Sequence, residues 1–293
     1  MYQKIVVPLD GSKLAEEILP IVFQLASGLE ARVHLVGIVD EEVVAPKAGA
    51  PTVDVARDAM NKADRYLRSI APYLHLPPER VHVMATVDRV AAGILKEAER
   101  EPDTLIAMST HGRSGVGRFA IGSVADKVLR ATRIPLLLYR PKGGTQVAAP
   151  PSTVIVPLDG SALAQKALAP ARDIAKKLNL RVLLMRARRS VPVYGGSLGV
   201  DWYDPMLDRE EERLANDYLQ FQERQLEKAG LEVSIRVLEG PAAEAIIGIV
   251  RDTPNSLVVM TTRGRSGAAR ALLGSVADRV VRHANAPVLL IRA

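Results

Sequence analysis

The sequence IVVPLDGSKLAEEILP at Ile5–Pro20 recurs as VIVPLDGSALAQKALAP at Val154–Pro170. A second shared signature closes each half of the chain, as GRSGVGRFAIGSVADKVLRATRIP at Gly112–Pro135 and GRSGAARALLGSVADRVVRHANAP at Gly264–Pro287. A repeat of this length is a duplicated domain, because solenoid units are only a few dozen residues long.

The duplication predicts two domains within the 293 residues, each long enough to bury a hydrophobic core of its own. We place the domains at residues 1–141 and 152–293. The segment between them, 142–151, is rich in Gly, Pro and Ala and is expected to be a linker.

Within each half, short apolar runs alternate with amphipathic stretches, as expected for strands that alternate with helices. The strands expected in the first half are Lys4–Pro8, Arg32–Val39, Arg80–Thr86, Thr104–Ser109 and Pro135–Tyr139. Those expected in the second half are Val154–Pro157, Arg181–Ala187, Glu232–Leu238, Ser256–Met260 and Pro287–Ile291. Between the first two strands we expect one helix over Leu14–Leu29.

The expected strands are apolar along their whole length, which favours a parallel sheet covered by helices on both faces. We therefore predict an α/β fold with two tandem doubly wound five-stranded parallel sheets. Each sheet has the strand order 3-2-1-4-5, a Rossmann-like nucleotide-binding arrangement.

Composition excludes several classes of protein. Hydrophobic residues make up 48% of the chain, yet no apolar stretch approaches the roughly 18 residues of a membrane-spanning helix. The N-terminal residues lead directly into a predicted strand without a signal-peptide pattern, and the absence of cysteine excludes disulfides and thiolate metal sites. We expect a cytoplasmic protein without a membrane partner.

The net charge of +6 raises the question of nucleic-acid binding. Basic residues are spread along the chain, however, and no arginine-rich arm is interleaved with aromatic residues. Aromatic residues make up 4% of the chain, too few for an obvious base-stacking platform. We do not expect a nucleic-acid partner.

The predicted strand order places a ligand crevice at the carboxyl ends of strands 1 and 4, where the order reverses. In the first half, strand 1 leads into Pro8-Leu9-Asp10-Gly11-Ser12, and strand 4 leads into Ser109-Thr110-His111-Gly112. Gly122-Ser123 then begins a helix. Both repeated blocks therefore converge on one crevice.

These residue types suit a nucleotide. Gly112 lets the backbone approach a phosphate, and Gly122 and Ser123 begin a helix whose free N–H groups favour an anion. Arg113 can add a charge-assisted contact, whereas Asp10 would repel phosphates and is assigned to ribose hydroxyls or the adenine amino group. The matching residues of the second half are Asp159, Gly264, Arg265, Gly274 and Ser275. The adjoining residues Pro8, Val124, Pro157 and Val276 complete the two predicted sites.

Structural alternatives exist for the same residues. Ser123–Asp126 and Ser275–Asp278 resemble capping boxes, and Asp126 could itself satisfy the helix dipole. Asp10-Gly11-Ser12 also fits a plain strand-to-helix turn with a serine N-cap. The joint occurrence of these features at one crevice, in both halves, favours a nucleotide-type ligand.

At these residues the chain resembles a tandem-domain universal stress protein over nearly its whole length. The family's phosphate-binding pattern, G-x2-G-x9-G-[S/T], corresponds here to Ser109-x2-Gly112-x9-Gly122-Ser123 and Thr261-x2-Gly264-x9-Gly274-Ser275. The resemblance implies ATP as the ligand, with or without Mg, and gives Asp10 and Asp159 contacts to adenosine. It also implies that the backbone of Ile38 and of Ala187 holds adenine. Family members that lack the motif do not bind ATP.

The two halves differ around the crevice. Ser109 and Thr261 replace the first glycine of the pattern, and β-branched Thr261 fits worse if that position requires a positive φ. Gly240-Pro241-Ala242 precedes the third helix of the second half, where the first half has the bulkier Asp88-Arg89-Val90. We therefore expect two non-equivalent sites. Arg186, Arg188 and Arg189 lie close to the second crevice, and we expect a solvated basic rim there in preference to an anion site.

No catalytic residue and no metal site are expected. His111 is replaced by Arg263 in the other half, and the remaining histidines lack metal-ligand spacing. The chain has neither a P-loop nor a nucleophile elbow. Hydrolysis of ATP is expected to be slow or absent.

Three functions are compatible with this sequence. The first is a stress-response module in which ATP acts as a regulatory switch, and the second is an interaction or scaffold protein with degenerate sites. The third, an adenylating or ATP-pyrophosphatase enzyme, is disfavoured because the Ser-Gly-Gly-x-Asp-Ser-type phosphate loop is missing. The resemblance further implies an internal pseudo-dimer through the last strands, 135–139 and 287–291, and leaves a homodimer open.

Overall fold

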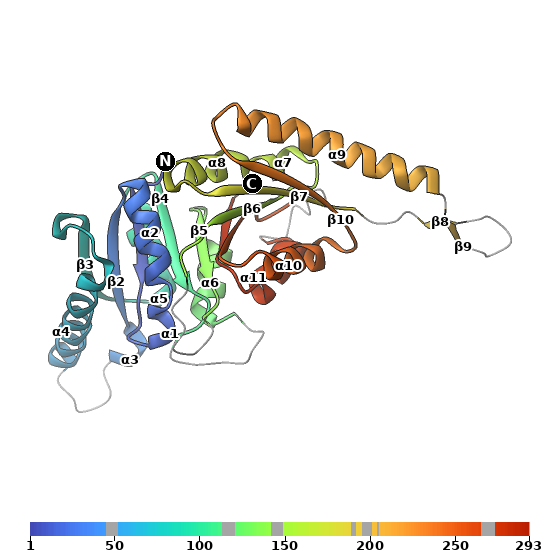
Figure 1. Cartoon of the computed structure of the whole chain (residues 1–293). Coiled ribbons are helices and arrows are strands. Elements are labelled where there is room, and N and C mark those ends of the chain that lie inside the picture. The colour runs from blue at the N-terminus through green and yellow to red at the C-terminus, as the bar shows by residue number, and fades with distance from the viewer. Residues whose placement is uncertain are drawn as a thin grey trace. The chain divides into compact units, whose positions relative to one another are not determined.

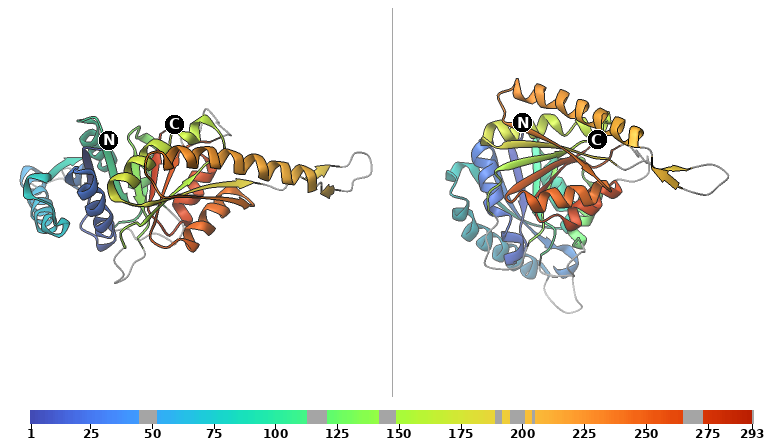
Figure 2. Two further views of the ribbon diagram at one scale, coloured as in Figure 1. Left: turned by 45° about the horizontal axis from the view of Figure 1, so that its top comes forward. Right: turned by 45° about the vertical axis from the view of Figure 1, so that its right-hand side comes forward.

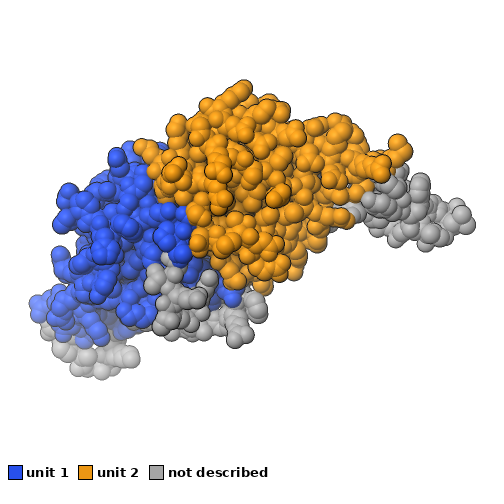
Figure 3. Space-filling view, viewed as in Figure 1, with its two compact units in different colours: residues 1–151, 287–292 blue, residues 152–286, 293 orange. Residues whose placement is uncertain are grey.

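The computed structural model describes residues 1–44, 52–112, 121–141, 149–188, 192–194, 201–203, 205–264 and 273–292. The chain divides into two compact units (Figure 3). Unit 1 comprises residues 1–151 and 287–292, and unit 2 comprises residues 152–286.

The first repeat forms a five-stranded parallel sheet in unit 1 (Figure 1). Its strands are β1 (Lys4–Pro8), β2 (Arg32–Asp40), β3 (Val81–Asp88), β4 (Thr104–Ser109) and β5 (Leu136–Tyr139). They lie in the order β3-β2-β1-β4-β5, and neighbouring strands are parallel. Every residue of β4 is buried, as expected for a strand covered on both faces. The predicted fold class and strand order are confirmed.

Helices cover both faces of this sheet. They are α1 (Lys13–Glu16), α2 (Leu19–Leu29), α3 (Glu41–Val44), α4 (Thr52–Ile70), α5 (Val90–Glu99) and α6 (Ser123–Ala131), with 3-10 turns η1 (Ala71–Leu74) and η2 (Pro78–Arg80). Side chains of a strand point alternately to opposite faces. In β2, a Cβ at Gly37 would meet Leu67 of α4, whereas Ile38 reaches Gly93 of α5. Helices α4 and α5 therefore lie on opposite faces of the sheet.

The single helix predicted over Leu14–Leu29 is wrong. Helix α1 ends at Glu16 and α2 begins at Leu19, with Pro20 in its first turn. Proline lacks a backbone N–H, so it fits the first turn of a helix but interrupts a continuous one.

Unit 1 also contains the last strand of the chain, β12 (Val288–Ile291). β12 pairs antiparallel with β5, so that Val288 lies opposite Leu138 and Leu290 opposite Leu136. Beyond it, the guanidinium group of Arg292 donates to the carbonyls of Thr132 (2.7 Å) and Leu129 (2.6 Å) at the carboxyl end of α6. These bonds satisfy carbonyls that a helix end leaves without intrahelical partners.

Unit 2 repeats the arrangement with β6 (Thr153–Pro157), β7 (Arg181–Arg188), β10 (Val233–Glu239) and β11 (Ser256–Thr261). These strands are parallel, in the order β10-β7-β6-β11. The helices are α7 (Ala162–Gln165), α8 (Leu168–Leu178), α9 (Pro205–Glu227), α10 (Ala242–Asp252) and α11 (Ser275–His283). Figures 1 and 2 show α8 and α9 on one face of these strands and α10 and α11 on the other. A small hairpin of β8 (Pro192–Tyr194) and β9 (Asp201–Tyr203) precedes α9.

Candidate functional site

Unit 1 has a cavity of about 230 Å³ where β1 and β4 end, which we call crevice 1. Of the residues predicted for this site, the structure places eight along it, namely Pro8, Asp10, Ile38, Ser109, Gly112, Gly122, Ser123 and Val124. Arg113 lies outside the described residues. Parallel strand ends thus bring together segments about 100 residues apart in the sequence.

Two glycines bring the loop after strand 4 against the acid that follows strand 1. A Cβ on Gly112 would collide with the carboxylate of Asp10, and one on Gly264 would collide with that of Asp159. The Oδ1 atom of Asp10 accepts hydrogen bonds from the N–H (2.9 Å) and hydroxyl (2.6 Å) of Ser12. Any side chain at position 112 would therefore displace a carboxylate that is already held in place.

The expected strand-to-helix turn at Asp10-Gly11-Ser12 is confirmed. Ser12 is the N-cap of α1, and its hydroxyl accepts from the N–H of Ala15 at 3.2 Å. Gly11 has a φ of 84°, a backbone conformation that favours glycine. The turn is therefore structural, and it also fixes the position of Asp10 at the crevice.

The amino end of α6 faces the same crevice. Its N-cap is Gly122, whose N–H donates to the carbonyl of Thr110 at 2.8 Å. A Cβ on Gly122 would lie 2.9 Å from that carbonyl oxygen. Glycine has no side chain to accept from the first turn, so the N–H groups of Ser123, Val124 and Ala125 have no capping side chain among the described residues.

The capping-box alternative for this helix is wrong. In both units the N-cap is glycine, Gly122 or Gly274, so the serine that follows it is already the first helical residue. Asp126 instead forms an ion pair with Arg130 at 2.8 Å, one turn further along. An arginine therefore engages the carboxylate that could have compensated the helix dipole.

The substitutions at the first glycine of the pattern cause no backbone strain. Ser109 and Thr261 are the last residues of β4 and β11, and neither has a positive φ. The Ser109 hydroxyl donates to the carbonyl of Leu14 at 2.9 Å, and that of Thr261 to the carbonyl of Arg263 at 2.6 Å. The expected disadvantage of a β-branched residue at Thr261 therefore does not apply.

Unit 2 has the corresponding cavity, crevice 2, with a volume of about 870 Å³. The predicted residues along it are Pro157, Asp159, Ala187, Thr261, Gly264, Gly274, Ser275 and Val276. Arg265 lies outside the described residues.

Smaller side chains at two lining positions contribute to the larger volume of crevice 2, which also has more residues along it. Ile38 and Val90 line crevice 1, whereas Ala187 and Ala242 occupy the corresponding places in crevice 2. Ile38 packs closely on α5, since a Cβ on Gly93 would lie 3.0 Å from its terminal methyl group. The two crevices therefore differ in volume and in lining, as expected.

Two of the arginines that line crevice 2, Arg186 and Arg188, do not form a solvated rim. The Arg188 side chain is 12% exposed and pairs with Asp208 at 2.6 Å. The guanidinium group of Arg186 lies 5.4 Å from the ring centroid of Tyr218 on α9. The prediction of a solvated rim is wrong for these two residues, and Arg189 lies outside the described residues.

His111 lies along crevice 1 and contacts its neighbour in the chain. Its Nδ1 atom lies 3.0 Å from the hydroxyl of Thr110. Across the described ranges, no three His, Cys, Asp or Glu side chains gather as a metal site would require. None of the helices in the same ranges has the length and apolarity needed to cross a membrane.

The fold and the two crevices define a duplicated α/β protein with a crevice at the switch point of each sheet. The chain belongs to the universal stress protein family, whose model matches residues 1–140 and 151–292. The family recognised from the glycine pattern is thereby confirmed.

Individual relatives match parts of the chain. A universal stress protein of Methanocaldococcus jannaschii is 29% identical over 139 residues, 47% of this chain and 81% of the relative. One of Mycobacterium tuberculosis is 30% identical over 184 residues, 62% of this chain, and the match spans only 60% of that relative's length.

Solved structures match the whole chain. A universal stress protein from Archaeoglobus fulgidus covers 100% of this chain and 99% of its own, with a TM-score of 0.74 and 18% identity. A structure from Pseudomonas aeruginosa described as a putative universal stress protein covers 99% of this chain and 93% of its own, with a TM-score of 0.65 and 17% identity. At these identities the structures establish the fold.

Proposed function

We propose that this chain is a stress-response protein that binds ATP in one or both crevices and uses the nucleotide as a regulatory switch. One observation carries the proposal. In each unit an acid after strand 1, a glycine turn after strand 4 and a helix amino end without a side-chain cap line a single cavity. Membership of the family supports the same ligand class.

Each group along the cavity suits one part of the nucleotide. The first-turn N–H groups of α6 and α11 would receive the phosphates, since they combine free donors with the positive end of a helix dipole. Asp10 and Asp159 would accept from ribose hydroxyls, and the backbone of Ile38 and Ala187 would hold adenine. Mg would be bound by the phosphates of the nucleotide. Arg113 and Arg265 would add positive charge near these phosphates.

Crevice 2 is the stronger candidate. Ligand pockets in proteins usually measure about 300–1,000 Å³, a range that includes the 870 Å³ of crevice 2. Crevice 1, at 230 Å³, is smaller, and Ile38 and Val90 fill part of it. That filling favours, for unit 1 alone, the alternative of a degenerate site in an interaction or scaffold protein.

We also propose an internal pseudo-dimer built on the last strands of the two repeats, 135–139 and 287–291. The antiparallel pairing of β5 with β12 supports this arrangement. Association of two chains would use other surfaces, and sedimentation of the purified protein tests it. We propose the cytoplasm as the location.

Calorimetric titration of the nucleotide-stripped full chain with Mg-ATP tests the proposed function. We expect binding at crevice 2, which Gly274→Val should abolish, because a Cβ there lies 3.1 Å from the carbonyl oxygen of Thr262. Gly122→Val tests crevice 1 in the same way. Gly248→Val on α10 is the matched control, since no described atom beyond its own helix backbone and chain neighbours lies within 4 Å of its Cβ position.

Stoichiometry and thermal unfolding separate the outcomes. If two nucleotides bind per chain, both crevices bind ATP. If one nucleotide binds, the glycine variant that loses binding identifies the crevice. ATP at about 100 times its dissociation constant should stabilise the fold by about 2.7 kcal/mol. No heat together with no thermal shift would rule out the nucleotide and leave the interaction protein.

A further inference from the structure

Among the described residues, crevice 2 carries guanidinium groups and crevice 1 carries none. Four arginines line it, at positions 186, 188, 263 and 279. The corresponding residues of the first repeat are Gly37, Val39, His111 and Lys127. Since both crevices share the same backbone plan, the arginines mark a property specific to crevice 2.

Two of the four arginines already have acidic partners. Arg188 pairs with Asp208, and Arg279 pairs with Glu244 at 2.6 Å. Within the described part of the chain, Arg186 and Arg263 form no ion pair, and the Nε atom of Arg263 is buried without a hydrogen-bond partner. Crevice 2 therefore contains two cations whose charge is available to a ligand.

Arg186 is held in a defined position. Its guanidinium group stacks on the ring of Tyr218, and its Nη1 atom lies 3.4 Å from the Cβ position of Gly160. Gly160 directly follows Asp159 and has a φ of 86°, so Arg186 covers the turn that presents this acid. Stacking on an aromatic ring orients an arginine while leaving its N–H donors free for an anion.

Strand order places Arg186 and the helix amino end at opposite ends of the crevice. β7, which carries Arg186, pairs with one side of β6, and β11, which leads to α11, pairs with the other. A nucleotide whose 5′-phosphates lie at α11 would bring its ribose to Asp159. Its nucleoside end would then lie on the β7 side of the crevice, which Arg186 lines.

We propose that crevice 2 is selective for a nucleotide that carries a second phosphate on its ribose, and that Arg186 is the residue that reads this group. The inference rests on the proposed function, because it assumes that the 5′-phosphates lie at α11. Arginine suits a ribose phosphate because its planar fork donates two parallel hydrogen bonds, and sheets of this type use arginine for that purpose. Of the acids along crevice 2, Glu244 is paired with Arg279, while Asp159 can accept from the remaining ribose hydroxyl. The third acid, Glu211, also lines this crevice.

Three ligands with the same number of phosphates test the proposal. ADP carries both phosphates in one chain, whereas adenosine 3′,5′-bisphosphate carries one at each end, as does its 2′,5′ isomer. We would titrate the full-length Gly122→Val protein with each ligand, so that only crevice 2 responds. We expect one of the bisphosphates to bind at least about tenfold more tightly than ADP, a difference of about 1.4 kcal/mol.

Variants on one strand then assign the preference. Arg186→Leu should weaken binding of the preferred bisphosphate about tenfold and change ADP affinity less than about threefold. Arg181→Leu removes the same charge from an exposed position at the other end of β7 and should change neither affinity. If Gly122→Val unfolds the protein, a two-site fit to the wild-type titration makes the same comparison of ligands.

Each result has one meaning. Equal affinities for ADP and both bisphosphates in the wild type would overturn the inference while leaving nucleotide binding intact. The inference would also be overturned if Arg186→Leu kept the preference for the bisphosphate over ADP. The same holds if Arg181→Leu abolished that preference as fully as Arg186→Leu. If neither ADP nor ATP nor either bisphosphate binds, the proposed function fails and this inference fails with it.

Discussion

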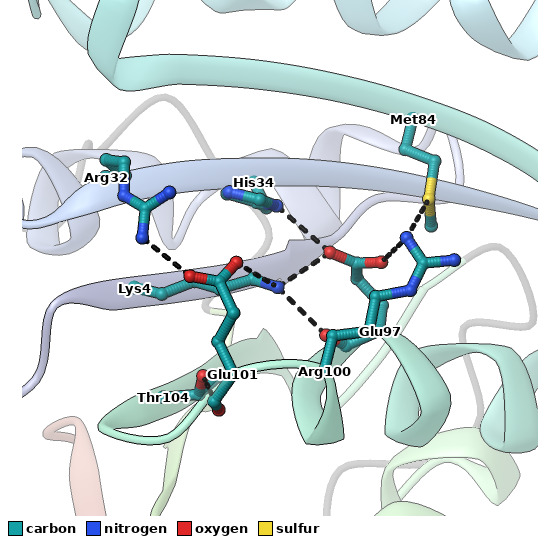
Figure 4. A network of polar contacts seen from close by, with 8 residues as sticks. All are labelled: Lys4, Arg32, His34, Met84, Glu97, Arg100, Glu101 and Thr104. Carbon is teal, nitrogen blue, oxygen red and sulfur yellow. Dashed lines mark hydrogen bonds and ion pairs between the residues drawn. The ribbon is translucent and has the colours of Figure 1, made fainter.

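The ammonium group of Lys4 lies 2.8 Å from the Oε1 atom of Glu97, although the two side chains are only 1% and 3% exposed (Figure 4). Lys4 begins β1, and Glu97 lies on α5. The Nδ1 atom of His34 lies 3.0 Å from the same carboxylate oxygen, and Arg100 contacts the other at 2.6 Å. Glu101 also pairs with Lys4, at 3.3 Å. A buried network of charges thus links the sheet of unit 1 to the helix that borders crevice 1.

The second repeat shows that the fold does not require this network. The residues that correspond to Lys4, His34 and Glu97 are Thr153, Leu183 and Ile249. Burying an ion pair costs desolvation energy that its attraction need not recover. The network is therefore a feature of unit 1 alone.

Removal of one partner should destabilise unit 1 strongly. Lys4→Met leaves the carboxylate of Glu97 buried without its ammonium partner, and we expect a loss of about 3–5 kcal/mol in the free energy of unfolding. The triple variant Lys4→Met, His34→Leu, Glu97→Leu replaces the charges with apolar groups and should recover most of that loss. Urea unfolding measures the free energy of unfolding of the single and the triple variant.

An exposed pair supplies the control for this experiment. Arg32 and Glu101, 42% and 36% exposed, form an ion pair at 2.6 Å. Arg32→Met should therefore cost less than about 1 kcal/mol. Equal losses for Lys4→Met and Arg32→Met would show that burial does not govern the energy of the Lys4–Glu97 pair.

The stability of unit 1 should fall in two steps as the pH decreases. Burial and the charge of Lys4 hold the pKa of His34 below its ordinary value of 6.5, against the raising effect of its hydrogen bond to Glu97. The unfolded chain therefore takes up a proton below about pH 6.5 that the folded chain resists, and stability decreases from that pH downward.

The second step involves Glu97. Burial opposes its charged form, but hydrogen bonds from Lys4 and His34 outweigh this effect and hold the pKa of Glu97 below its ordinary value of 4.5. The stability it contributes is complete above pH 4.5 and decreases as the pH falls through its folded-state pKa.

Unfolding curves between pH 8 and pH 2.5 separate these contributions. His34→Gln should flatten the first step and leave the second, since glutamine cannot titrate but can still donate to Glu97. His75→Asn removes an exposed histidine and keeps a residue type that tolerates its φ of 48°. If His75→Asn flattens the curve as much as His34→Gln, the assignment to His34 is wrong.

Enlarging crevice 1 should strengthen its binding of ATP. The double variant Ile38→Ala, Val90→Ala gives crevice 1 the alanines found in crevice 2, and we expect an affinity gain of about tenfold or more, about 1.4 kcal/mol. The reciprocal change Ala187→Ile should weaken crevice 2. Calorimetry of each variant in a background that silences the other crevice provides the measurement, and unchanged affinities would show that volume does not limit binding.

Loss of β12 should expose the edge of β5. A chain that ends at Ala286 lacks the strand paired with Leu136–Leu138, and unpaired apolar edges promote association. We expect its apparent mass in sedimentation to rise with concentration more steeply than that of the full chain. Arg292→Gln keeps the strand but loses the bonds to α6, so it should be less stable without self-associating. A truncated chain that behaves like the full one would contradict this role of β12.

The sequence predicts the strand order and the position of the crevices because both follow from local patterns and a duplicated motif. It does not reveal the network around Lys4, whose members lie on three elements far apart in the chain. The sequence nevertheless contained a signal for this network, in the helix of Glu97. The buried stripe of α5 comprises Gly93, Ile94, Glu97 and Ala98, and a carboxylate in an apolar stripe requires a cation opposite it.

Two corrections have different causes, one local and one tertiary. The break between α1 and α2 depends on where a proline falls within a turn, and the hydrophobic period continues through it. The environment of Arg186 depends on α9, an element separated from it by residues without a clear periodic pattern. Contacts of this kind are set by tertiary packing, which a single sequence does not specify.

The pairing of β12 with β5 also has a consequence for how the protein is made. About 150 residues separate the two strands in the chain, and ribosomes add about 5–20 residues per second. The first repeat therefore waits roughly 7 to 30 seconds after its own synthesis before its sixth strand exists. During that interval a nascent unit 1 presents an open apolar edge, and neighbouring ribosomes on the same message present identical ones. We expect this stage to be where chaperones engage the chain.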